Sequence, residues 1–175
     1  MSLFEVAEQQ LGSLRKYYGK YRATVFNNLD PFQMGRIQVV VPDVSNIAIS
    51  SWALPCLPWC GPQQGIMCVP PIGAGVWVEF EQGDPDYPVW TGCFWGSAGE
   101  VPSGSRVVAP SLGITIQTLG QNMIQLSELG IILKTRSGAM LSITDAGIVI
   151  TNGAGATISM VANTVDINGG ALTIM

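Results

Sequence analysis

From Ile114 onward, hydrophobic and polar positions follow a repeating pattern with a 17-residue period. Segments of five residues alternate with connectors of five and two residues, and the first and third residues of each segment are apolar. The residue between them is polar in six of the eight segments. Such alternation is typical of strands with one face on a core and the other on solvent. We therefore predict eight short strands, starting at Ile114, Ile124, Ile131, Leu141, Ile148, Ile158, Val165 and Leu172.

Strands this short cannot cover their own apolar face. Five residues span about 17 Å, so one chain alone leaves strand edges and apolar side chains uncovered. Three chains wound about a common axis would pair the edges and close a three-sided core, in an intertwined needle about 40 Å long. The predicted trimer core comprises Ile114, Ile116, Ile124, Leu126, Ile131, Leu133, Leu141, Ile143, Ile148, Ile150, Ile158, Met160, Val165 and Ile167.

The period breaks at the end of the printed sequence. The last connector, Gly170-Ala171, has two residues where five are expected. We predict the tip of the needle here, at Leu172, Thr173, Ile174 and Met175. A single-chain solenoid is the alternative interpretation of the repeat. Because solenoids usually need coils of about 20 or more residues to enclose a core, we favour the trimer.

The region before the repeat, residues 20–96, has shorter apolar runs separated by Gly and Pro. Five strands are predicted, at Tyr21 to Phe26, Arg36 to Val41, Trp52 to Leu57, Val76 to Phe80 and Val89 to Trp95. Five short strands in such a length suit a small closed barrel, and the OB-fold is the natural candidate. The chain is therefore predicted to be all-β apart from its N-terminal segment.

The N-terminal segment has helical spacing instead. Ser2 and Glu5 have the spacing of a capping box, and apolar residues recur at helical intervals as far as Gly19. We expect a helix over residues 2–18, which either packs on the barrel or docks on a neighbouring protein. Its docking residues would be Leu3, Phe4, Leu11 and Leu14. The expected layout is a helix (1–19), an OB domain (20–96), a Ser/Gly/Pro-rich linker (97–113) and a needle (114–175).

Composition agrees with a surface that other chains cover. Only 11% of the residues are charged, 47% are hydrophobic, and the mean hydropathy is +0.35, whereas soluble domains are about 25% charged. No apolar run approaches the roughly 18 to 20 residues of a membrane-spanning helix. The apolar excess therefore indicates an obligate interface between chains.

The charge distribution argues against nucleic-acid binding. The net charge is −4, with five basic and nine acidic residues before Ser103 and no basic cluster to neutralise phosphates. The N-terminus lacks the pattern of a secretory signal. The spacing of Cys56, Cys60, Cys68 and Cys93 fits neither a zinc ribbon nor a disulfide scaffold. We expect reduced, mostly buried thiols and synthesis in the bacterial cytoplasm.

The acidic residues do not suggest an active site. The chain has no histidine, so Ser and Cys nucleophiles lack an obvious base. Glu128 and Asp145 lie one full period apart, at the same position of equivalent strands, where a solvated acid is unremarkable. We predict no catalytic, cofactor or metal site.

One stretch of the barrel region carries a specific motif. Residues 34–96 contain MGRIQV, the turn PPIGAG, and the string GVWVEFEQGDPDYPVWTG. These resemble the OB domain of the spike family found in contractile phage baseplates, type VI secretion spikes and contractile injection systems. Family spikes place a triple-stranded β-helix after the OB barrel, so the resemblance extends over the repeat.

The resemblance implies a structural spike at the tip of a contractile tail or injection particle, which joins the baseplate hub and inner tube to a needle that pierces the target cell envelope. It also implies a possible tip-capping repeat protein as partner. No muramidase domain separates barrel from needle here, and no His-x-His metal site is present. With so little chain before the barrel, a separate hub protein would supply the connection to the tube.

An alternative function is an OB-fold module that binds oligosaccharides or nucleic acid and is oligomerised by the needle. The aromatic side chains of Trp52, Trp59, Trp77, Trp90 and Trp95 could form a stacking platform. Without a basic groove, we expect these residues to pack the barrel and its trimer contacts instead.

Overall fold

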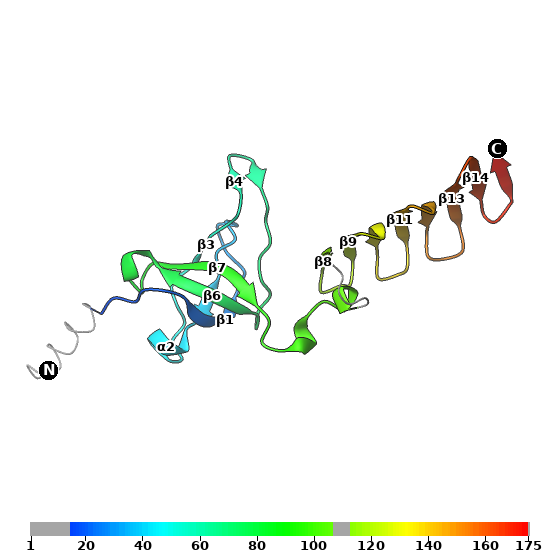
Figure 1. Ribbon diagram of the computed structural model, residues 1–175. Helices are drawn as coiled ribbons and strands as arrows, with labels where there is room; N and C mark the ends of the chain where they lie inside the picture. The colour runs from blue at the N-terminus through cyan, green and yellow to red at the C-terminus, as the bar shows by residue number, and fades with distance from the viewer. Residues whose placement is uncertain (1–14, 107–112, 175) are drawn as a thin grey trace, which may run out of the picture. The chain divides into compact units, whose positions relative to one another are not determined.

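A computed structural model describes residues 15–106 and 113–174 of the chain. The chain forms two compact units, Met1–Ala98 and Gly99–Met175. Figure 1 shows the elements of both. The regular secondary structure of the described part is mostly β-strand, so the predicted all-β class is confirmed.

The first unit is a closed β-barrel. Its five-stranded sheet has the order β2-β1-β6-β7-β3, antiparallel except where β3 runs parallel to β7. The sheet closes on itself because Ile37, just before β2, exchanges two backbone hydrogen bonds with Ala53, just before β3. The bounds are β1 Tyr21–Asn27, β2 Gln38–Val40, β3 Leu54–Pro55, β6 Gly75–Phe80 and β7 Pro88–Phe94. All five predicted strands are present.

Alternate residues of these strands fill the barrel. The burial of β6 alternates strictly, with Val76, Val78 and Phe80 inside. The buried core consists of Ala23, Val25, Ile37, Val39, Val41, Ala53, Val76, Val78, Phe80 and Trp90. Trp90 satisfies its indole N–H by donating to the carbonyl of Gly35, 3.1 Å away. An apolar interior with its polar groups paired is what a stable small barrel requires.

The barrel carries further elements that were not predicted from the sequence. A short helix, α2 (Pro42–Ser45), follows β2, and a 3₁₀ turn, η1 (Glu81–Gly83), joins β6 to β7. A two-stranded hairpin, β4 (Cys60–Gly61) with β5 (Gln64–Gly65), lies between β3 and β6. Its sequence has no apolar alternation, which is why the hairpin could not be recognised beforehand.

The segment before β1 differs from expectation. Residues 2–14 of the predicted helix, including its docking residues, lie outside the described part. Residues 15–18 are not helical, which corrects the end of that helix. The cause is the barrel: Tyr17 donates its backbone N–H to Gly83, and its ring packs edge-on to Tyr21 and against Phe80.

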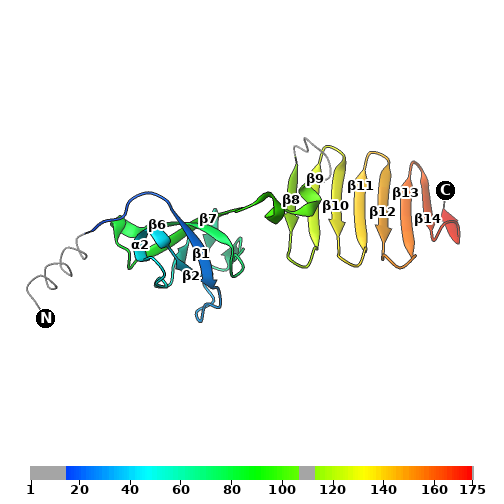
Figure 2. The ribbon, with the colours of Figure 1, turned by 90° about the horizontal axis from the view of Figure 1, so that it is seen from below.

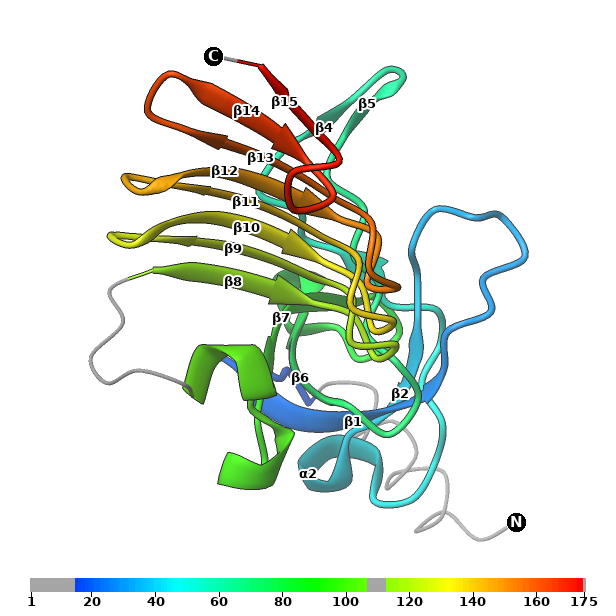
Figure 3. The same ribbon diagram turned by 90° about the vertical axis from the view of Figure 1, so that its right-hand side faces the viewer.

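The second unit is a single antiparallel sheet of eight strands in chain order, β8 to β15 (Figure 2). The strands are β8 Ile114–Gln117, β9 Met123–Ser127, β10 Gly130–Lys134, β11 Met140–Thr144, β12 Gly147–Thr151, β13 Thr157–Val161, β14 Thr164–Ile167 and β15 Leu172–Ile174. All eight predicted strands are therefore confirmed. Each pairs with its chain neighbours, and Figure 3 shows the strands stacked side by side.

The five-residue connectors share one hydrogen-bond motif. At equivalent positions of successive repeats, the side chains of Thr118, Thr135 and Asn152 accept the backbone N–H four residues further on, at 3.0 to 3.2 Å. Thr, Ser and Asn are suited to such local caps because a short side chain can reach the backbone. The sequence period therefore repeats turn chemistry as well as apolar positions.

A second series with the same period consists of Gly113, Gly130 and Gly147. A β-carbon on these residues would overlap the carbonyl oxygens of Leu126, Ile143 and Met160, which are themselves equivalent residues of successive repeats. Gly130 and Gly147 also have positive φ, +131° and +144°. Glycine is therefore required here by close approach to the next strand as well as by turn geometry.

The predicted linker is in part attached to this sheet. It contains two short 3₁₀ turns, η2 (Ala98–Glu100) and η3 (Ser103–Arg106). Gln117 accepts the N–H of Gly104 at 3.1 Å, and Gln125 donates to the carbonyl of Gly104 at 3.2 Å. The segment around Gly104 is thus held against β8 and β9 instead of being a free connection.

Candidate trimer interface

The apolar residues of the eight-stranded sheet lie in two continuous columns. Antiparallel register places each directly opposite another apolar residue, as in Ile131↔Ile143 and Leu133↔Leu141. One column is Ile114, Leu126, Ile131, Ile143, Ile148, Met160, Val165 and Ile174. The other is Ile116, Ile124, Leu133, Leu141, Ile150, Ile158, Ile167 and Leu172. The structure therefore brings all fourteen predicted core residues onto one face.

This face has no cover in the single chain. From Gly99 onward, none of the residues whose burial the structure describes is buried, whereas the barrel has ten buried apolar residues. Ile150 is 44% exposed and Ile116 is 59% exposed. A hollow of about 570 Å³ runs along one column, lined by Ile116, Ile124, Leu133, Leu141 and Ile150. Apolar surface of this extent marks an interface, because monomeric proteins rarely leave it in water.

The edges of most strands, unlike the apolar face, are already paired within the chain. Each of the six inner strands, β9 to β14, is hydrogen-bonded on both sides to strands of its own chain. The prediction that partner chains pair these edges is therefore wrong for the inner strands. Alternation along a strand indicates which face is apolar but not which chain supplies the neighbour. What the sheet lacks is a covering for its face.

The opposite face of the sheet is mostly polar. Its central row includes Thr115, Gln125, Ile132, Ser142, Val149, Ser159 and Asp166. Only Ile132 and Val149 interrupt the row, and Ser142 separates them. The sheet therefore has one apolar face and one polar face.

The predicted tip residues are placed in part. Leu172 and Ile174 extend the two columns through their pairing with Ile167 and Val165, and both are more than half exposed. Met175 lies outside the described residues. The acidic residues Glu128 and Asp145 are exposed in equivalent two-residue turns. Among the described residues, no group of three or more His, Cys, Asp or Glu could hold a metal ion.

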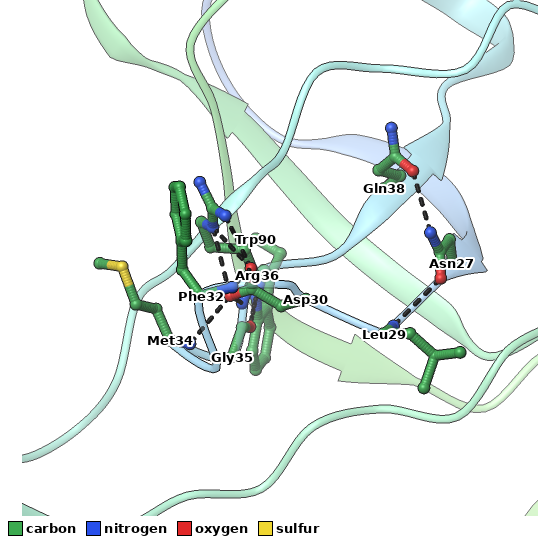
Figure 4. A network of polar contacts seen from close by, with 9 residues as sticks. All are labelled: Asn27, Leu29, Asp30, Phe32, Met34, Gly35, Arg36, Gln38 and Trp90. Atoms are coloured by element: carbon green, nitrogen blue, oxygen red, sulfur yellow. Dashed lines mark hydrogen bonds and ion pairs between the residues drawn. The ribbon is translucent and has the colours of Figure 1, made fainter.

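The barrel also has a loop between β1 and β2 that is held by a network of polar contacts (Figure 4). Asp30 accepts hydrogen bonds from the backbone N–H groups of Phe32, Met34 and Arg36, and its Oδ1 lies 2.7 Å from the guanidinium of Arg36. The Arg36 guanidinium holds the pKa of Asp30 well below its usual range. Arg36 in turn lies over the rings of Phe32 and Trp52. Apart from an Asp-Pro turn, no sequence pattern signals this network.

The tryptophans do not gather on one platform. Trp90 is buried, Trp52 and Trp77 are covered by Arg36 and Arg22, and Trp59 and Trp95 are exposed in separate segments. The cysteines also differ from expectation: all four are free, but all four are exposed in the single chain. Cys60 lies in the hairpin that leaves the barrel, and Cys68 follows this hairpin closely.

Comparison with known families separates the two units in the same way. Residues 21–95 match the type VI secretion system/phage-baseplate injector OB domain. Residues 113–173 match the phage baseplate V C-terminal trimerisation domain, which accounts for the uncovered apolar face. The chain belongs to the phage baseplate V family. The eight-stranded sheet is its trimerisation domain.

Individual relatives match this chain over part of its length. The spike protein VgrG3 of the Vibrio cholerae type VI secretion system is 36% identical over 72 residues, 39% of this chain. VgrG1a of Pseudomonas aeruginosa, also a type VI spike protein, is 38% identical over 74 residues, 40% of the chain. The matched stretches are only 7% and 12% of these relatives. Among the described residues, no helix is long and apolar enough to cross a membrane.

Proposed function

We propose that three copies of this chain form the spike at the tip of a contractile tail or injection particle. Three eight-stranded sheets face one another with their apolar columns and enclose a continuous dry core, while the polar faces meet solvent. The observation that carries the proposal is the pair of apolar columns on a unit without a buried residue of its own among those described. The trimerisation domain and the relatives named as spike proteins support it.

The mechanism is mechanical and uses no catalytic, cofactor or metal site. Contraction of a sheath drives the inner tube, and the needle concentrates the force on a small area of the target cell envelope. Stiffness comes from in-chain hydrogen-bonded ladders along the needle and from the shared apolar core. Three sheets packed in this way resist bending, because main-chain hydrogen bonds and packed side chains run along the whole length of the needle.

The partners follow from this role. Residues 1–19 dock on the baseplate hub and inner tube through Leu3, Phe4, Leu11 and Leu14, and residues 20–96 form the collar from which the needle starts. The end at Leu172–Met175 meets the envelope or a tip-capping repeat protein. The protein is made in the bacterial cytoplasm and incorporated into the particle, and it binds no nucleic acid.

Cryo-electron microscopy of purified particles tests this role. A tag added after Met175 should appear at the distal tip of the particle. Particles lacking residues 114–175 should contract without permeabilising target cells. Location of the tag along the sheath or in a capsid, or full permeabilisation by the truncated particles, would contradict the proposal.

A further inference from the structure

The barrel unit has a second apolar surface, on the segment between β3 and β6. The residues from Pro58 to Cys68, which we term the arm, are all exposed and contain the β4–β5 hairpin. Figures 1 and 3 show the hairpin projecting from the barrel. The arm exposes three large apolar side chains, Trp59 (54%), Ile66 (53%) and Met67 (60%).

The base of the arm packs against the barrel, whereas its tip makes few contacts. At its base, Leu57 and Val69 pack against the barrel core, and Cys56 donates its backbone N–H to Trp90. Further out, only Cys60↔Gly65 and Gly61↔Gln64 pair, with one more hydrogen bond from Ile66 to Trp59. An isolated two-stranded hairpin is marginally stable in water and needs a surface to pack on.

Charge indicates what kind of surface this is. No Asp, Glu, Lys or Arg occurs between Asp43 and Glu79. Beside the arm, a hollow of about 320 Å³ is lined by Met34, Leu57, Cys60, Ile66 and Met67 together with glutamine and glycine. Proteins that associate transiently commonly use complementary charges to guide their encounter. Permanent interfaces between subunits are more apolar. The arm has the composition of a permanent contact.

We infer that the arm packs on the barrel unit of a second copy of this chain. This inference rests on the proposed trimer, which holds three barrels on short tethers at an effective concentration in the millimolar range. Five extended residues from Pro58 to the hairpin turn reach about 17 Å, more than the roughly 12 Å radius of gyration of a compact unit of this size. Each arm reaches the next barrel, and three such contacts close a ring.

Site-specific photocrosslinking in the full chain tests the arm contact. Ile66 is replaced by p-benzoylphenylalanine, and Asp43, exposed on α2, is replaced in a control. Irradiation of the Ile66 variant should give covalent dimers and trimers on denaturing gels, with crosslinked peptides from residues 15–98 of another copy. The Asp43 variant, and the Ile66 variant in a monomeric Ile150→Asp background, should give none.

Thiol labelling gives a second readout without a bulky probe. In a chain that keeps Cys60 and has serine at Cys56, Cys68 and Cys93, maleimide should react at least tenfold more slowly in the trimer than in the Ile150→Asp monomer. A trimer of correct mass with equal labelling, and with crosslinks absent or confined to one chain or to a different protein, would overturn the arm contact and leave the spike intact. A wild-type monomer would overturn the proposed trimer itself.

Discussion

Ile150 on β12 lies directly opposite Ile158 on β13, and in the single chain Ile150 is 44% exposed. The neighbouring Val149 points to the opposite face, across from Ser159. These two adjacent residues of one strand therefore lie on opposite faces of the sheet, Ile150 on the apolar face and Val149 on the polar face.

Ile150→Asp should abolish the trimer, because it places three carboxylates on the axis and an unpaired buried charge costs several kcal/mol. Val149→Asp adds the same charge on the polar face and should leave the trimer intact. Analytical ultracentrifugation measures both. Stable trimers of the Ile150 variant would mean that the apolar columns do not face the axis.

Gly147→Ala should destabilise the needle more than Gly155→Ala. Both glycines have positive φ, which costs a β-carbon about 1–2 kcal/mol. At Gly147 the β-carbon would also overlap the carbonyl of Met160, whereas at Gly155 it meets open space. Thermal unfolding followed by circular dichroism should show the larger decrease in Tm for Gly147→Ala. Equal decreases would show that close approach of the strands is unimportant.

Asp30 makes the stability of the barrel depend on pH. Its folded pKa lies below its unfolded value of about 3.9, so its contribution is complete at neutral pH and declines as the pH falls below about 5. Asp30→Asn should lower the free energy of unfolding at pH 7 and flatten its decrease between pH 5 and pH 2. Urea titrations measure this, with Asp43→Asn on the surface as control. An unchanged pH slope in Asp30→Asn would argue against the ion pair with Arg36.

The hydrogen bonds that hold Gly104 against β8 and β9 should limit proteolysis of the neighbouring segment. Replacing both Gln117 and Gln125 by alanine removes the two side-chain hydrogen bonds to Gly104 and should increase tryptic cleavage after Arg106 severalfold. Gln121→Ala, in an exposed connector, should leave the rate unchanged. Equal rates in all three proteins would show that the glutamines do not hold this segment.

Much of this architecture could be predicted from the sequence. The needle strands were predictable because equivalent apolar positions, such as Leu133 and Ile150, return in every repeat. The barrel strands were predictable because runs such as Val76 to Phe80 alternate between core and surface. Whether the neighbour of each strand belongs to the same chain or to another could not be predicted, because the alternation is the same in both cases.

Other features depend on contacts between residues far apart in sequence. The non-helical backbone of Tyr17 is held by its hydrogen bond to the carbonyl of Gly83, which helical spacing cannot indicate. The exposure of Cys60 follows from a hairpin whose residues show no apolar pattern. The aromatic neighbours of Arg36 come from two different loops, so the network around Asp30 becomes visible only once the barrel is closed.

Native mass spectrometry of the purified full chain tests the central claim most directly. We expect one species with the mass of three chains of 18.6 kDa each, present down to low protein concentration because the sheet has no core without its partners. A folded monomer of 18.6 kDa would contradict the trimeric spike.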